Sequence, residues 1–232
     1  MVFITGDTHI PHDINKLNEI NFPEQLTLTK ADYVIICGDF GGVWDNSPER
    51  IECLDWLEGR NFTTLFIDGN HENFDLLNAY PVKEWNGGNA HSIRPSVIHL
   101  MRGQIFNING KKIFTFGGAA SFDKASRIPG TSWWQEEIPS AEEQAEGFYN
   151  LAANDYEVDY IITHTCPSSI LDEYPEMVPG MMNHFDSTTE EYLEKIKNNV
   201  YDYKIWCFGH WHSDIDFDGI HTLVYNKIIL IE

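Results

Sequence analysis

The sequence has few basic residues. Of its 232 residues, 15 are Lys or Arg and 36 are Asp or Glu, which leaves a formal charge of −21. Proteins that follow the phosphates of a long nucleic acid carry a broad basic surface instead. The charge therefore argues against long nucleic acids as partners. An anionic substrate would have to be held by a few local side chains or by metal ions.

Long apolar runs and a secretion signal are also missing. No run reaches the 18 apolar residues of a membrane-spanning helix. The first residues lack the basic segment and long apolar stretch of a signal peptide. The four cysteines (Cys37, Cys53, Cys166 and Cys207) show no CxxC spacing, which is typical of reduced thiols rather than a disulfide framework or zinc knuckle. We therefore expect a cytoplasmic protein that does not enter membranes.

Short apolar runs, rich in β-branched and aromatic residues, predict strands. Runs of this length are typical of strands that are covered on both faces. They span residues 2–5, 33–37, 63–67, 160–163 and 204–208. Helices are predicted between them, from Ser47-Pro48 to about Gly59, from Ser140 to about Ala153, and from Thr188 to about Asn198. Pro at a first position, and Glu three residues after Ser140 and Thr188, mark their starts.

The middle and the end of the sequence indicate hairpins and loops. Asn109-Gly110 and Asp218-Gly219 each separate two apolar runs, and such pairs favour tight turns; a final strand is predicted over 228–231. Residues 80–95 and 121–139 are predicted to be irregular and are candidate substrate loops, because long loops in compact domains are usually functional. Length and pattern together predict one α/β domain over residues 1–232, with two sheets packed between helices.

Side chains that can bind metals follow five of the predicted strands. Open α/β sheets place their ligands at the carboxyl ends of strands, and Asp, Asn and His suit first-row divalent ions. Seven such donors are too many for one metal with an open position, but they fit two metals that share a carboxylate. The motifs are Gly6-Asp7-Thr8-His9, Gly38-Asp39, Gly69-Asn70-His71-Glu72, Thr163-His164 and Gly209-His210-Trp211-His212.

Together these motifs resemble the calcineurin-like metallophosphoesterase superfamily. They occur in the family's order from residue 6 to residue 212, each after a predicted strand. The resemblance implies an α/β fold of the four-layered α/β/β/α sandwich type, in which two mixed β-sheets are flanked by helices. This architecture agrees with the independent pattern of strands and helices.

The resemblance also implies a ligand set and a mechanism. The first metal would be held by Asp7, His9 and His212, the second by Asn70, His164 and His210, and both by Asp39. A metal-bridging hydroxide would attack phosphorus, and a protonated His71 would act as the catalytic residue that assists the leaving group. Mn²⁺ is our first choice for the two divalent ions, with Fe, Zn or Ni as alternatives, because the ligand types do not decide among them. Glu72 is expected to make local hydrogen bonds at a helix start.

Two further residues are candidates for substrate contact. His12 lies close to the first metal-binding motif, and Arg127 lies in the segment 121–139 near Trp133-Trp134. Arg can contact phosphate through two hydrogen bonds, and Trp offers a stacking face. In the alternative interpretation the Trp pair is structural. The Asp-Arg-Gly run of related phosphoprotein phosphatases is missing after Asp39, so protein phosphatase activity would require Arg127 as a substitute.

The sequence thus predicts a dinuclear metal-dependent phosphohydrolase. Its substrate would be a small phosphomonoester or phosphodiester, with a nucleotide among the candidates, and its oligomeric state is left open. One alternative is a catalytically silent binding scaffold of the same fold, although such proteins are expected to lose ligands and here the set is complete. The other is a nuclease, although the extra domains and basic surfaces of such enzymes are missing here.

Overall fold

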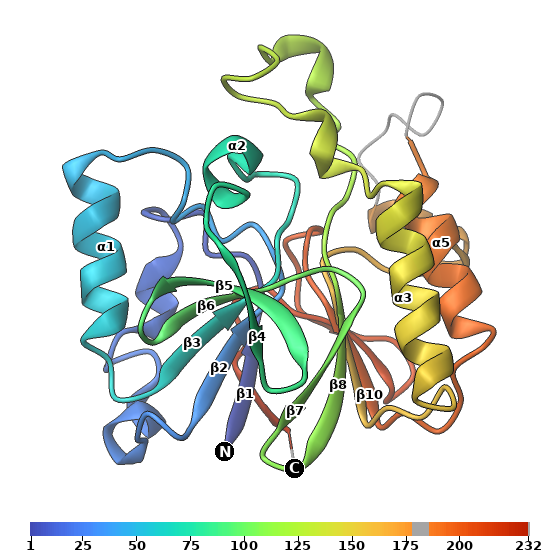
Figure 1. Ribbon diagram of the computed structural model, residues 1–232, viewed down its shortest axis with the longest axis horizontal. Coiled ribbons are helices and arrows are strands. Elements are labelled where there is room, and N and C mark those ends of the chain that lie inside the picture. Colours follow the sequence, from blue (N-terminus) through green and yellow to red (C-terminus); the bar gives the residue numbers. More distant parts are fainter. Residues whose placement is uncertain (178–185, 232) are drawn as a thin grey trace.

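The computed structural model describes residues 1–177 and 186–231, which form two β-sheets packed face to face between helices (Figure 1). The first sheet has the strand order β13 (Ile229–Ile231), β1 (Val2–Thr5), β2 (Tyr33–Ile36), β3 (Thr63–Phe66), β6 (Val97–Leu100), β5 (Gly88–Arg94) and β4 (Val82–Trp85). The second has the order β11 (Ile215–Asp216), β12 (His221–Leu223), β10 (Ile205–Phe208), β9 (Tyr160–Thr163), β8 (Lys111–Phe116) and β7 (Gln104–Ile108).

The central strands of both sheets run parallel. In the first sheet β1, β2, β3 and β6 are parallel, and in the second β8, β9, β10 and β12 are parallel. Thr5, Ile36 and Phe66, which end β1 to β3, are register partners. Thr163 and Phe208, which end β9 and β10, are partners in the same way. The segments that leave these strands therefore begin at the same level of each sheet.

Helices cover the outer faces of the two sheets. α1 (Pro48–Glu58) lies on the first sheet, and α3 (Ala141–Ala153) and α5 (Thr188–Lys197) lie on the second (Figure 1). The shorter elements are α2 (Phe74–Leu77), α4 (Ser168–Glu173) and the 3-10 helices η1 (Ile14–Leu17), η2 (Pro23–Thr27), η3 (Lys124–Ser126), η4 (Gln135–Glu137) and η5 (Pro175–Met177). Within the described ranges, no helix combines the length and the apolar character needed to cross a membrane.

Strand side chains alternate between apolar layers. In β2, Ile35 packs between the sheets, whereas Val34 and Ile36 pack toward α1. In β10, Cys207 packs between the sheets, and Trp206 packs toward α5. Each sheet is therefore covered on both faces, which explains the continuous apolar runs. The predicted four-layered sandwich is confirmed.

Both predicted hairpins form, β7–β8 at Asn109-Gly110 and β11–β12 at Asp218-Gly219, and a third lies where no hairpin is predicted. Asn109-Gly110 joins β7 to β8 with φ values of 53° and 79°, as a type I′ turn requires. The prediction that residues 80–95 are irregular is wrong, because most of them form the antiparallel strands β4 and β5. Asn86-Gly87 joins these strands with φ values of 49° and 95°. β4 is an exposed edge strand, so it lacks the apolar pattern that reveals a covered one.

One of the two predicted capping boxes is formed and the other is not. α3 begins with the predicted capping box, in which Ser140 Oγ accepts from Glu143 N (3.2 Å) and Glu143 Oε2 accepts from Ser140 N (2.7 Å). The predicted box of Thr188 and Glu191 is not formed, because Ser187 is the N-cap of α5. Ser187 Oγ instead donates to Glu191 Oε1 (2.7 Å). A Ser directly before Thr displaces the cap by one residue.

Candidate metal centre

The side chains of the five motifs meet where the two sheets present the carboxyl ends of their strands. Asp7 follows β1, Asp39 follows β2, Asn70 follows β3, His164 follows β9 and His210 follows β10. The aligned ends of these strands bring residues from the first and last parts of the chain together. The site is therefore a product of the parallel topology of both sheets.

One group of ligand atoms gathers around the carboxylates of Asp7 and Asp39. Asp7, His9, Asp39 and His212 each offer an atom that lies within 4.8 Å of the others. His9 Nε2 is 3.2 Å from Asp39 Oδ2, and His212 Nε2 is 3.1 Å from Asp7 Oδ2. Both carboxylates are fully buried. These are the residues that the resemblance assigns to the first metal and its bridge.

A second group adjoins the first through Asp39. His164 Nε2 lies 3.3 Å from Asp39 Oδ1 and 3.0 Å from Asn70 Oδ1. The His210 ring lies beside the His164 ring, with 5.0 Å between centroids. Asp39 thus directs Oδ2 to the first group and Oδ1 to the second. The two oxygens of one carboxylate therefore face both groups of candidate ligands.

The outer nitrogens of two histidines are held by other groups. His9 Nδ1 lies 2.9 Å from Asp13 Oδ2, which also accepts from Tyr225 OH (3.2 Å). His164 Nδ1 donates to the backbone oxygen of Cys37 (2.8 Å). Such contacts fix the ring and direct Nε2 toward the place where a metal would bind. The sequence motifs gave no sign of Asp13 or of the Cys37 carbonyl, because these partners carry no family pattern.

The backbone of the site is strained. Non-glycine residues seldom adopt positive φ outside turns, and at functional sites the surrounding structure can hold them in this conformation. Four of the seven candidate ligands have such values: His9 (36°), Asp39 (45°), His210 (70°) and His212 (47°). The fold thus accepts a conformational cost in order to aim these side chains inward.

Three observations fit this donor set to divalent cations. His210 Nε2 is buried and has no hydrogen-bond partner. A bound cation would give this nitrogen a partner. A Cβ at Gly38 would lie 2.2 Å from His164 Nδ1, and one at Gly209 would lie 2.1 Å from Asp7 Oδ1, so the glycines leave the space that the ligands fill. In the described part of the chain, neither buried carboxylate forms an ion pair with Lys or Arg.

Protonation in the site follows from this charge distribution. Burial opposes a charged His9, but its hydrogen bond and proximity to the Asp39 carboxylate outweigh burial and raise the pKa of His9 to about 9. Burial likewise opposes a charged Asp39, but the neighbouring histidines, His164 first, hold its pKa well below the ordinary value. Burial lowers the pKa of His210 to about 3. The proton of His9 therefore occupies a place that a cation would take.

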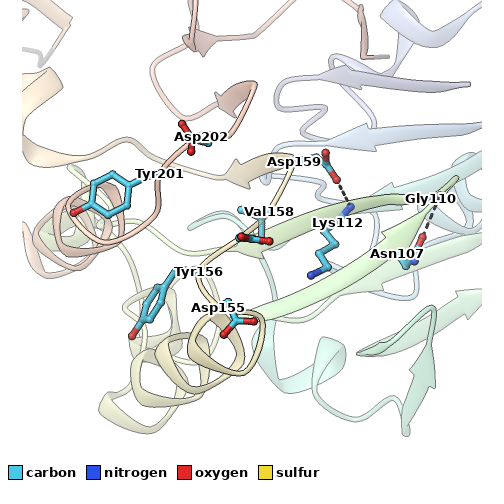
Figure 2. Close-up of a pocket in the computed structure, with 10 residues that line it drawn as sticks. Asn107, Gly110, Lys112, Asp155, Tyr156, Val158, Asp159, Tyr201 and Asp202 are labelled. Carbon is cyan, nitrogen blue, oxygen red and sulfur yellow. Dashed lines mark hydrogen bonds between the residues drawn. The ribbon is translucent and has the colours of Figure 1, made fainter.

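A pocket of about 360 Å³ opens onto these residues. Its lining includes Asn70, His71, Phe122, Arg127 and Trp211. A larger hollow of about 590 Å³ lies elsewhere, among residues such as Lys112, Asp155 and Asp159, near the amino ends of β8 and β9 (Figure 2). Because α/β sheets bind ligands at the carboxyl ends of their strands, the smaller pocket is the candidate active site.

The segment 121–139 contributes Arg127 to this pocket. Arg127 Nη2 donates to His71 Nε2 (3.3 Å), and Arg127 Nε donates to Asp123 Oδ1 (2.6 Å). Trp133 and Trp134 are buried, and Trp134 Nε1 donates to Asp75 Oδ2 (2.8 Å). The structural interpretation therefore holds for the Trp pair. It does not extend to Arg127, whose guanidinium faces the site.

Two other sequence-based candidates lie differently from the expectation. The His12 side chain is exposed and is not among the described residues that line the pocket, although His12 N donates to His9 O (2.8 Å). Glu72 is fully buried and accepts from Phe40 N (2.7 Å) and Gly41 N (3.4 Å). Glu72 therefore does not make the hydrogen bonds expected at a helix start. It stabilises the loop after β2, directly after Asp39.

The fold and the site together define a two-sheet α/β sandwich with adjoining candidate sites for two cations. The family model for calcineurin-like phosphoesterases matches residues 1–214. The chain therefore belongs to the calcineurin-like phosphoesterase family, as its motifs predicted. Membership implies metal binding and metal-dependent hydrolysis of phosphoesters. A comparison with curated proteins gave no match.

Proposed function

We propose that the protein is a dinuclear metal-dependent phosphohydrolase of the cytoplasm, acting on a small phosphomonoester or phosphodiester. The observation that carries this proposal is the buried Asp39 carboxylate, whose two oxygens face two different groups of ligands. Manganese is our first choice for both ions, with Fe, Zn or Ni as alternatives. Four free cysteines support a reducing compartment.

The chain's own residues divide the work around the ions. Two divalent cations, when bound, supply an acidified water and neutralise charge on phosphoryl oxygens. Asp7, His9 and His212 would hold one, and Asn70, His164 and His210 the other. Asp13 and the Cys37 carbonyl fix the ring orientations of His9 and His164. This fixed arrangement reduces the reorganisation needed when substrate binds.

His71 and Arg127 together would control the proton that is given to the leaving group. His71 N donates to Asp39 Oδ1 (2.7 Å), which places its ring next to the bridge. Burial lowers the pKa of His71, and the Arg127 charge lowers it further against the pull of Asp39. His71 is thus neutral while its Nε2 accepts from Arg127. A phosphate that draws Arg127 away frees Nε2 and favours protonation, so His71 then assists departure of the alkoxide.

The pocket supports a small substrate with an aromatic group, such as a nucleotide. Phe122 and Trp211 line it with 5.5 Å between their ring centroids, and Met177 also lines the pocket. Arg127 supplies the guanidinium that the missing Asp-Arg-Gly motif would otherwise provide. A volume of about 360 Å³ fits a small ester. The acidic composition argues against long nucleic acids here.

Phosphoesterase assays test the proposal directly. Protein freed of metal with a chelator should gain activity toward a chromogenic monoester or diester when Mn²⁺ is restored. Asp202→Asn, in the hollow of Figure 2, is a matched control that should leave this activity unchanged. Two bound Mn²⁺ ions without turnover of any phosphoester in a panel would favour the silent scaffold. Faster cleavage of an oligonucleotide than of every small ester would favour the nuclease.

A further inference from the structure

Ser121 and Glu137 form a buried pair directly behind Asn70. Ser121 Oγ donates to Glu137 Oε2 (2.5 Å), and Ser121 N donates to Glu137 Oε1 (3.0 Å). Glu137, the last residue of η4, is 1% exposed. A hydroxyl has one hydrogen, so Ser121 Oγ can act toward any third group only as an acceptor.

That third group is the side-chain amide of Asn70. Asn70 Nδ2 donates to Ser121 Oγ (3.1 Å), while Asn70 Oδ1 lies on the other side, 3.0 Å from His164 Nε2. The two orientations of an Asn amide have nearly the same shape, so only the hydrogen-bond partners choose between them. A cation binds the amide oxygen and not the nitrogen. A flipped Asn70 would therefore lose its value as a ligand.

We propose that Ser121 and Glu137 are positioning residues that hold Asn70 with its oxygen toward the second metal. This inference rests on the proposed function, because Asn70 is a ligand only if a second ion binds. The hydrogen bonds run in one direction: the Glu137 carboxylate accepts from Ser121, and Ser121 accepts from Asn70. Partners of this kind, one step behind the ligands, change metal affinity by about 10–100-fold in other proteins.

The position of Glu137 is itself anchored. Arg102 Nη2 donates to the backbone oxygen of Glu136 (2.8 Å), and the same guanidinium pairs with Asp68. Ser121 and Glu137 also enclose the segment that carries Phe122 and Arg127, so one pair of side chains closes the base of the substrate loop and orients a metal ligand. Loss of the pair should affect both functions together.

A double-mutant cycle separates orientation from packing. Mn²⁺ is titrated by calorimetry into the wild type, Ser121→Ala, Asn70→Asp and the double variant. We expect Ser121→Ala to weaken the second Mn²⁺ by about 10–100-fold and to leave the first unchanged. In the Asn70→Asp background it should cost nothing further, because a carboxylate presents an oxygen in either orientation. Ser126→Ala, an exposed serine of the same segment, is the matched control.

Each outcome decides the question. An equal loss of affinity in both backgrounds would show that Ser121 only packs, and an unchanged second site in Ser121→Ala would overturn the inference outright. If thermal melting shows that Ser121→Ala does not fold, Glu137→Gln replaces it in the same cycle with the same expectation. A wild type that binds fewer than two Mn²⁺ ions refutes the dinuclear function and the inference with it. A wild type with two ions and no cycle effect refutes the inference alone.

Discussion

Asp39 and Asp68 are buried aspartates that follow neighbouring strands, yet the chain treats them differently. Asp68 receives two hydrogen bonds from Arg102, from Nε (2.8 Å) and Nη2 (2.5 Å), and its other oxygen lies 3.2 Å from His99 Nε2. Asp39 faces His9 and His164 instead. Arg keeps its charge at any physiological pH, whereas His can give its proton up.

The difference shows that the Asp68 charge has a permanent structural partner, whereas the partner of the Asp39 charge can be exchanged for a cation. Burial opposes ionisation of Asp68, but Arg102 outweighs burial and holds the pKa of Asp68 far below its usual range. This pair needs nothing from outside the chain. Asp39 lies beside the protonated His9, whose proton a cation can replace. The same fold thus provides a permanent partner one strand away from a site that leaves room for metal.

The largest effect is expected from Asp39→Asn. Because one carboxylate faces both ligand groups, the variant should bind less of both metals, and kcat should fall by a factor on the order of 10³ or more. Metal content by elemental analysis and turnover on a phosphoester check this. Normal dinuclear occupancy with a normal rate would show that the bridge lies elsewhere.

Asp68→Asn should act on stability instead. It removes the buried ion partner of the Arg102 guanidinium and leaves only the more exposed Glu143 beside it, and breaking a buried pair costs about 3–5 kcal/mol in the free energy of unfolding. The loss should be the same with and without Mn²⁺, because Asp68 belongs to neither ligand group. Denaturant unfolding with a chelator and with added metal measures it. A loss of stability seen only with metal present would show that Asp68 belongs to the metal site together with Asp39.

The stability of the metal-free protein should depend on pH through His9, which lies beside Asp39, and not through Asp68. The folded pKa of His9 is about 9 and its ordinary value is 6.5, so this stabilisation is complete below pH 6.5 and is lost as pH rises through 9. It amounts to about 3 kcal/mol. Asp68, whose pKa is lowered, contributes no slope in this range. His9→Asn should reduce the slope in chelator; an equal slope in both proteins would refute the assignment.

His71→Ala should separate chemistry from metal binding next to Asp39. The side chain is absent from both ligand groups, so both metals should remain. The loss of a proton-transfer group should lower kcat by about 10²-fold or more. Metal analysis and steady-state kinetics on the same sample give the result. A variant that loses one metal would make His71 a ligand and contradict its assigned role.

Arg127→Ala should give the smallest effect and contrasts with Arg102. Arg102 is buried and serves the fold, whereas Arg127 faces the pocket, so its loss should raise KM about 10-fold with little change in unfolding free energy. It should also raise the pKa of His71, which the Arg127 charge lowers. Kinetics and thermal melting together test this. An unchanged KM for the true substrate would return Arg127 to a structural role.

The predictable parts of the molecule are those with a local signal. Covered strands can be recognised by their apolar runs, and the candidate ligand motifs follow the ends of these strands. The sandwich and the place where the motifs meet could therefore be predicted. The strand β4 could not, because an exposed edge carries polar residues. Asp13, Ser121 and Glu137 could not either, because each matters only through a partner that folding brings close. Contacts of this kind, such as Asn70 with Ser121, leave no periodic trace in a single sequence.

The pairing of β1 with β13 has a consequence for biosynthesis. The strand that carries Asp7 at its end completes its hydrogen bonds only with residues near the other terminus, and His210 and His212 are translated some 200 residues after Asp7. A nascent polypeptide whose synthesis has not yet reached His210 therefore holds only a partial set of the candidate ligands. The complete candidate metal centre can assemble only after β10 has paired in the second sheet and has placed His210 beside Asp7.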